Sequence, residues 1–156
     1  MKNIDIIRNH KGIKSIVLFL SSFCVLLSFV GYIGLLVYLL IQKEYMELIK
    51  TILIPLSTIT IVEIIRHLYN RPRPFEKYRY LPLIDHRPGR SFPSKHATSS
   101  MIIALSIYHV LPSLGMVFLF NALLVGITRI LSGIHYPSDV CGGYILGYLM
   151  YLFYLI

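Results

Sequence analysis

Residues 16–41 form a run of 26 residues that contains no charged side chain. A transmembrane helix needs about 20 consecutive apolar residues, so this run is long enough to cross a bilayer. A cleaved signal peptide is the competing interpretation, but its apolar region spans only about 7–15 residues and ends in small residues, which this run does not. The run therefore predicts a membrane span.

The rest of the chain has the same apolar character. Of its 156 residues, 56% are hydrophobic and 14% charged, whereas a soluble domain carries about 25% charged residues. With no internal repeat or linker, we expect one all-α domain over residues 1–156, a multi-pass transmembrane helix bundle of about five spans. The expected spans are residues 16–41, 48–69, 96–111, 114–131 and 139–156.

Prolines and Gly89 in residues 70–93 exclude a continuous helix, so this segment is expected to be a loop at a membrane face. Counting spans places the 70–93 and 132–138 loops on the same side. Eight of the fifteen basic residues lie between residues 66 and 95, against two acids. Such a patch suits an anionic lipid head or a phosphorylated substrate. Nucleic acid is not expected as a partner, because a short loop between spans is no nucleic-acid-binding module.

Three polar clusters flank these two loops. They are Arg66 with Arg73-Pro74 after six intervening residues, the segment 91–96, and Thr128-Arg129 with His135 and Asp139. Placing charged side chains in or next to a membrane costs free energy, so their presence there indicates a functional site. Within the last span, Gly143 and Gly147 permit close helix packing, which we expect against a helix of the same chain rather than in a dimer.

His135 precedes Asp139 by four residues, so the carboxylate can hold one ring nitrogen and leave the other free to attack an electrophile. Ser94 stands at the N-terminus of an apolar run, where free N–H groups and the helix dipole favour an anion. His96 lies in the first turn of that helix. These positions predict a site that handles an anionic substrate.

Arginine suits phosphate because its planar guanidinium offers paired donors and stays charged. Arg66, Arg73 and Arg129 should converge on one membrane face, with Glu63 pairing with Arg66 or His67 at helical spacing. No carboxylate cluster or His and Cys spacing typical of a metal site is present, so no metal ligands are predicted.

Together the clusters resemble the three signature motifs of the type-2 phosphatidic acid phosphatase superfamily, Lys-x6-Arg-Pro, Pro-Ser-Gly-His and Ser-Arg-x5-His-x3-Asp. Their order and internal spacing match over residues 50–156. Arg66 replaces the lysine, Thr128 the serine and Lys95 the glycine of those motifs. The chain is also one span short of the six-helix bundle that the family implies.

The resemblance implies a lipid phosphatase that uses no cofactor. His135, oriented by Asp139, forms a phosphohistidine, and His96 protonates the leaving oxygen and then activates water. The phosphate-binding residues are expected to be Arg66, Arg73, Ser94, Lys95 and Arg129, with Lys95 a further cation for a diphosphate. Substrates implied for small bacterial members are undecaprenyl diphosphate, phosphatidylglycerol phosphate and lipid A 1-phosphate.

Two other functions are compatible with the motifs. A vanadate-dependent oxidative enzyme is disfavoured by the apolar spans, and a non-catalytic phosphate-binding membrane protein by the intact His96, His135 and Asp139. Basic residues near span ends would place the site in the cytoplasm. We nevertheless expect it on the extracytoplasmic side of the bacterial plasma membrane, as the family implies, with the basic N-terminal tail as an interfacial helix.

Overall fold

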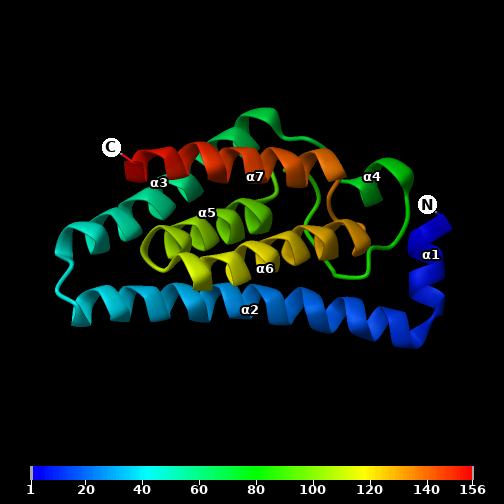
Figure 1. Ribbon diagram of the computed structural model, residues 1–156. Coiled ribbons are helices and arrows are strands. Elements are labelled where there is room, and N and C mark those ends of the chain that lie inside the picture. The colour runs from blue at the N-terminus through cyan, green and yellow to red at the C-terminus, as the bar shows by residue number, and fades with distance from the viewer. Residues whose placement is uncertain (1, 156) are drawn as a thin grey trace.

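The computed structural model describes residues 2–155, and every regular element in that range is a helix. Figure 1 shows their arrangement. The elements are α1 (Lys2–Asn9), α2 (Lys11–Ile41), α3 (Tyr45–Tyr69), α4 (Pro74–Tyr78), α5 (Lys95–Val110), α6 (Pro112–Leu131), α7 (Pro137–Tyr151) and the 3-10 helix η1 (Leu152–Leu155). The all-α bundle predicted from the apolar runs is therefore confirmed, and five long helices lie where five spans were expected.

Helix α5 occupies the centre of the bundle and contacts α2, α3, α6 and α7. Its side chains Ile102, Ala104 and Ile107 are fully buried. It ends at Val110 because Pro112 cannot extend a helix, yet the fixed backbone of proline suits the first turn of α6. The two helices consequently run antiparallel around the single residue Leu111.

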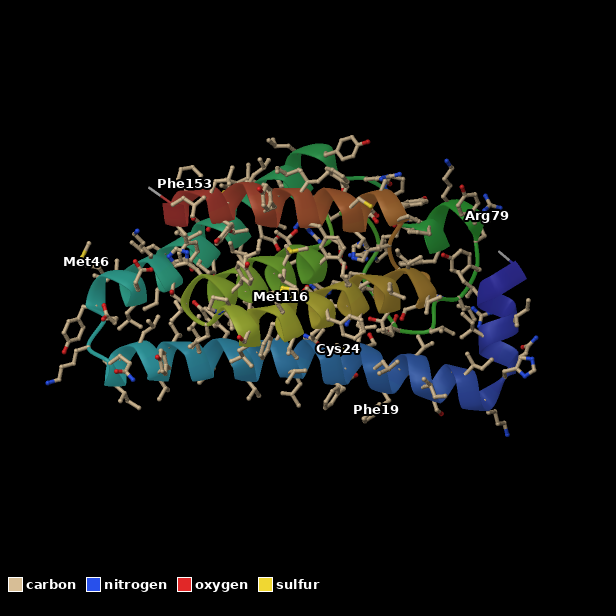
Figure 2. The ribbon with its side chains drawn as sticks, viewed as in Figure 1. Phe19, Cys24, Met46, Arg79, Met116 and Phe153 are labelled. Carbon is tan, nitrogen blue, oxygen red and sulfur yellow. The ribbon has the colours of Figure 1, made fainter. Side chains whose placement is uncertain are left out.

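Three segments of the described chain are long and apolar enough to cross a membrane, namely α2, the Tyr45–Tyr78 segment that contains α3, and α6. Large apolar side chains cover their outer faces, as Phe19 does where it points away from the bundle (Figure 2), whereas Cys24 on the opposite face of α2 is buried. These surfaces suit lipid, and the chain is an integral membrane protein. Helix α5, with 16 residues, spans only about 24 Å and relies on its neighbours for cover.

Both polar loops and α1 lie at one end of the bundle, opposite the C-terminus (Figure 1). The same-side placement predicted for the 70–93 and 132–138 loops is thus confirmed. The short helix α4 within the first loop was not predicted from the sequence. Pro74 starts it at a position where no backbone donor is needed, and Arg79 ends it with a left-handed φ of 52°.

Helices α5 and α7 approach closely at two glycines of α7. A β-carbon at Gly143 would lie 2.9 Å from the Ser94 carbonyl oxygen, and one at Gly147 would lie 3.0 Å from Met101 Cβ. The glycine pair therefore packs within the chain, as expected. Because the Ser94 N–H donates to the Asp139 carbonyl at 2.9 Å, this contact also aligns the start of α5 with the start of α7.

Candidate active site

His135, in the loop between α6 and α7, lies beside Asp139 in α7, and both side chains are buried. His135 Nδ1 is 3.5 Å from Asp139 Oδ2, while its Nε2 is 3.4 Å from Arg73 Nη1. The proline at the start of α7 places Asp139 in the first helical turn, and its carboxylate accepts a hydrogen bond from the Tyr136 N–H at 3.0 Å. One ring nitrogen therefore faces a carboxylate and the other faces a cation.

Two further side chains hold Asp139, and neither was predicted. Arg71 Nη1 donates to Oδ1 at 2.6 Å, and Ser91 Oγ donates to Oδ2 at 2.5 Å. Arg71 also stacks 4.2 Å above the Tyr136 ring. Both donors come from the 70–94 loop, far from Asp139 in the chain, so no local spacing reveals them. The available signals were the Arg-Pro-Arg-Pro sequence of residues 71–74 for Arg71 and the polar 91–96 segment for Ser91.

Burial, with a smaller contribution from nearby Arg73, lowers the pKa of His135 to about 4 against the opposing effect of Asp139. The imidazole is therefore neutral at neutral pH. With Nδ1–H directed at the carboxylate, Nε2 keeps its lone pair, which is the state that a nucleophilic histidine requires.

Arg73 is held by backbone carbonyls from two loops. Its Nε donates to Gly89 at 3.0 Å and its Nη1 to Ile134 at 3.0 Å. Glu76 fastens the same region, since Oε2 accepts the N–H groups of Arg73 and Gly89, each at 2.7 Å. Gly89 adopts a φ of +70°, which a side chain would strain. These contacts leave the guanidinium rigidly placed beside His135.

Arg66, Ser94 and Arg129 are buried and only partly paired. Arg66 Nη1 donates to the Pro93 carbonyl at 3.3 Å, and Arg129 Nη2 donates to the Ser21 carbonyl at 2.9 Å. Within the described residues, Arg66 Nε, Ser94 Oγ and Arg129 Nε are buried without a hydrogen-bond partner. An unsatisfied buried donor costs about 1–3 kcal/mol. Oxygens of a bound phosphate are suitable acceptors for all three.

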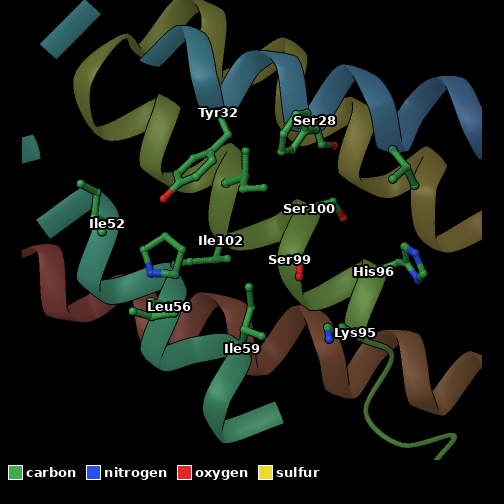
Figure 3. A pocket seen from close by; sticks show the side chains of 14 residues that line it. Ser28, Tyr32, Ile52, Leu56, Ile59, Lys95, His96, Ser99, Ser100 and Ile102 are labelled. Carbon is green, nitrogen blue, oxygen red and sulfur yellow. The ribbon is translucent and has the colours of Figure 1, made fainter. Parts of the chain in front are cut away.

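His96 lines an apolar cavity of about 480 Å³ between α2, α3 and α5 (Figure 3). The charged and titratable groups that act on His96 are those of Arg66, His86, Arg129 and His135. The charges of Arg66 and Arg129 thus act on His96, which also forms part of the wall of the apolar cavity.

Lys95 lines the same cavity, but its Nζ donates to Glu63 Oε1 at 2.8 Å. The hydrogen-bonded partner of Glu63 is thus Lys95 rather than the expected Arg66 or His67. Lys95 reaches Glu63 because α5 packs against α3. The structure directs the Arg66 guanidinium toward Pro93 instead.

His86 lies in the loop before α5, and the charges of the site arginines act on it. The Leu83 N–H donates to the Ser132 carbonyl at 3.0 Å and draws the two loops together. Burial lowers the pKa of His86, and the charges of Arg73, Arg66 and Arg129 contribute. Its Nδ1 is buried without a partner among the described residues. His86 is consequently a further polar group facing the arginines.

No group of three or more His, Cys, Asp or Glu side chains within the described residues has the arrangement of a metal site. The donors that surround His135 are arginines and a serine, which bind anions rather than cations. Metal independence remains a prediction, and phosphate is the ligand that this donor set fits.

Comparison with known proteins identifies relatives over almost the whole chain. The bacitracin transport permease protein BcrC of Bacillus licheniformis is 31% identical over 152 residues, covering 96% of this chain and 73% of that protein. Undecaprenyl-diphosphatase BcrC of Bacillus subtilis is 36% identical over 90 residues, covering 55% of this chain and 47% of the relative. This chain spans less than half of the second relative.

The fold has a counterpart among solved structures. The crystal structure of Aquifex aeolicus LpxE superposes with a TM-score of 0.73 at 25% identity, covering 88% of this chain and 86% of that one. The family model of the PAP2 superfamily matches residues 44–156, a range that contains all three motifs. The chain therefore belongs to the PAP2 (type-2 phosphatidic acid phosphatase) superfamily, as the motifs predicted.

Proposed function

We propose that this chain is a membrane lipid phosphatase that hydrolyses a phosphate monoester or diphosphate on a lipid head group. The observation that carries the proposal is the set of buried, unpaired donors on Arg66, Ser94 and Arg129, together with a neutral His135 whose Nδ1 lies 3.5 Å from Asp139. Such donors stabilise the equatorial oxygens of a transferring phosphoryl group, where charge is spread in the transition state.

In the proposed reaction, His135 Nε2 attacks phosphorus and the bond to the leaving oxygen breaks. Asp139 stabilises the positive charge that develops on the imidazole. His96 supplies a proton to the leaving oxygen, and then takes one from the water that hydrolyses the phosphohistidine. The products are inorganic phosphate and a lipid that has lost one phosphate, which is an alcohol from a monophosphate substrate and a lipid monophosphate from a diphosphate. His135 returns to its neutral state.

The apolar cavity beside His96 supports a lipid as the leaving group. Its walls include Phe29, Ile52, Leu56, Ile59 and Ile103, whose side chains suit an acyl or isoprenyl chain (Figure 3). A relative named undecaprenyl-diphosphatase points to the same class of substrate. The candidates are undecaprenyl diphosphate, phosphatidylglycerol phosphate and lipid A 1-phosphate.

The decisive experiment measures phosphate release from these three lipids by purified protein in detergent, with a chelator present. We expect release by the wild type and none above background by His135→Ala. His109→Ala is the matched control, because His109 contacts Glu47 at the opposite end of the bundle and should leave activity intact. Full activity of His135→Ala would rule out the mechanism, and loss of wild-type activity on chelation would rule out metal independence.

We further propose that the protein lies in a bacterial plasma membrane with its site on the extracytoplasmic side. A Cys141→Ser background removes the exposed thiol, while Cys24 stays buried. In that background, Arg87→Cys places a thiol on the exposed loop beside the site. Labelling of intact cells by a membrane-impermeant maleimide is expected, whereas labelling only after lysis would reverse the orientation.

A further inference from the structure

We propose that Lys95 makes this site selective for lipid diphosphates, by binding the phosphate that stays on the lipid. This inference rests on the proposed phosphatase function and assigns its substrate class. Lys95 and His96 are the first two residues of α5, and both line the apolar cavity that suits the lipid chain (Figure 3).

The position of Lys95 corresponds to the leaving-group side of the reaction. Displacement at phosphorus is in line, so the leaving oxygen departs opposite the attacking His135. In the proposed reaction His96 marks that opposite side, because it protonates the leaving oxygen and lines the apolar cavity. A group bonded to the leaving oxygen therefore passes His96 and Lys95 before it enters the apolar cavity.

The chemistry of the two substrate classes differs at this point. With a diphosphate, His135 Nε2 bonds to the distal phosphorus, the bond from that phosphorus to the bridging oxygen breaks, and the electron pair stays on a lipid monophosphate. The departing group then carries negative charge that a cation stabilises. With a monophosphate, the departing group is an alcohol that takes its proton from His96 and carries no phosphate. A cation beside His96 thus favours diphosphates selectively.

Glu63 holds Lys95 in this position without removing the local positive charge. The Lys95–Glu63 distance is 2.8 Å, and the two side chains are 45% and 43% exposed. Exposed ion pairs contribute little to stability, so breaking this pair costs little free energy. The charges of Arg66 and Arg90 act on Glu63 in addition to that of Lys95, so this one carboxylate does not neutralise the local positive charge. The surplus positive charge suits a second phosphate, toward which Lys95 can turn.

The test compares farnesyl diphosphate with farnesyl monophosphate, which carry the same chain and differ by one phosphate. Removing a charged hydrogen-bond partner in Lys95→Ala should lower the diphosphate-to-monophosphate ratio of kcat/KM about tenfold, mainly through kcat. Lys95→Arg should restore the ratio, because it keeps the cation. Glu63→Gln removes the charged partner of Lys95, so the diphosphate-to-monophosphate ratio of kcat/KM should stay equal or rise.

A structural ion pair would behave differently. Lys95→Ala and Glu63→Gln would then impair both substrates in parallel and leave the ratio unchanged, which overturns the proposal. A wild type that hydrolyses only the monophosphate also overturns it, while leaving the phosphatase function standing. A separate result would contradict the phosphatase mechanism itself. In that case His135→Ala would be as active as the wild type on both substrates.

Discussion

Arg71 Nη1 lies 2.6 Å from Asp139 Oδ1, so a cation from the loop after α3 holds the carboxylate that faces His135. Asp139 is fully buried, and Ser91 and the Tyr136 N–H occupy its other oxygen. A buried carboxylate is tolerated only when it is paired and hydrogen-bonded. In the proposed reaction, Arg71 acts through Asp139 as a positioning residue.

Arg71→Gln should lower kcat about ten- to hundredfold, the effect expected when a partner that orients a functional group is lost. KM should change little, because Arg71 is directed at Asp139 and not at the predicted phosphate-binding residues. Steady-state kinetics on one lipid substrate provide the measurement. Arg87→Gln is the matched control, since it removes an exposed cation from the same loop. A raised KM with unchanged kcat would instead make Arg71 a substrate ligand.

His96→Ala should separate the two halves of the proposed reaction. A lipid monophosphate is a good leaving group that departs without full protonation, so His135 should still be phosphorylated by a diphosphate substrate. Hydrolysis of the phosphohistidine then stalls, because no base activates water. Rapid quenching with a substrate labelled in its distal phosphate should reveal protein-bound label in His96→Ala and none in His135→Ala. Absence of label in both variants would contradict a covalent intermediate.

The lowered pKa of His135 makes the stability of the fold depend on pH. Between pH 6.5 and about 4 the unfolded chain binds a proton at this residue and the folded chain does not, so stability decreases as pH falls through that window. The shift corresponds to about 3 kcal/mol. Thermal unfolding in detergent should show a steeper loss on acidification for the wild type than for His135→Gln. Equal slopes would mean that His135 titrates normally in the folded protein.

Gly143→Ala should impair both stability and activity. Its β-carbon would lie 2.9 Å from the Ser94 carbonyl and 2.9 Å from Thr98 Oγ1, so α5 and α7 must separate. Overpacking of this kind costs about 1–3 kcal/mol, and it moves Ser94 relative to Asp139. Gly34→Ala is the control, because no atom lies within 4 Å of its added carbon. A melting temperature of Gly143→Ala equal to that of the control would show that the interface adapts.

Much of the fold follows from local pattern. The long apolar runs indicate the helices, and Pro112 predicts the break between α5 and α6, because both properties act over a few neighbouring residues. Counting the spans places the two polar loops on one side. Helix α4 was missed because the prolines around it predict a break and do not reveal that Pro74 starts a new turn.

The sequence by itself determined the three motifs. The separation of four residues between His135, just before α7, and Asp139, in its first turn, is short enough to bring the two side chains together. Only the tertiary structure decided which side chains complete the site. Arg71 and Ser91 lie 68 and 48 residues from Asp139, and Lys95 meets Glu63 across two helices. Contacts over such separations depend on how α5 packs against α3 and α7. Gly143 allows the close approach of α5 and α7. Helix packing is a property of all the facing side chains at once, and no short pattern encodes it.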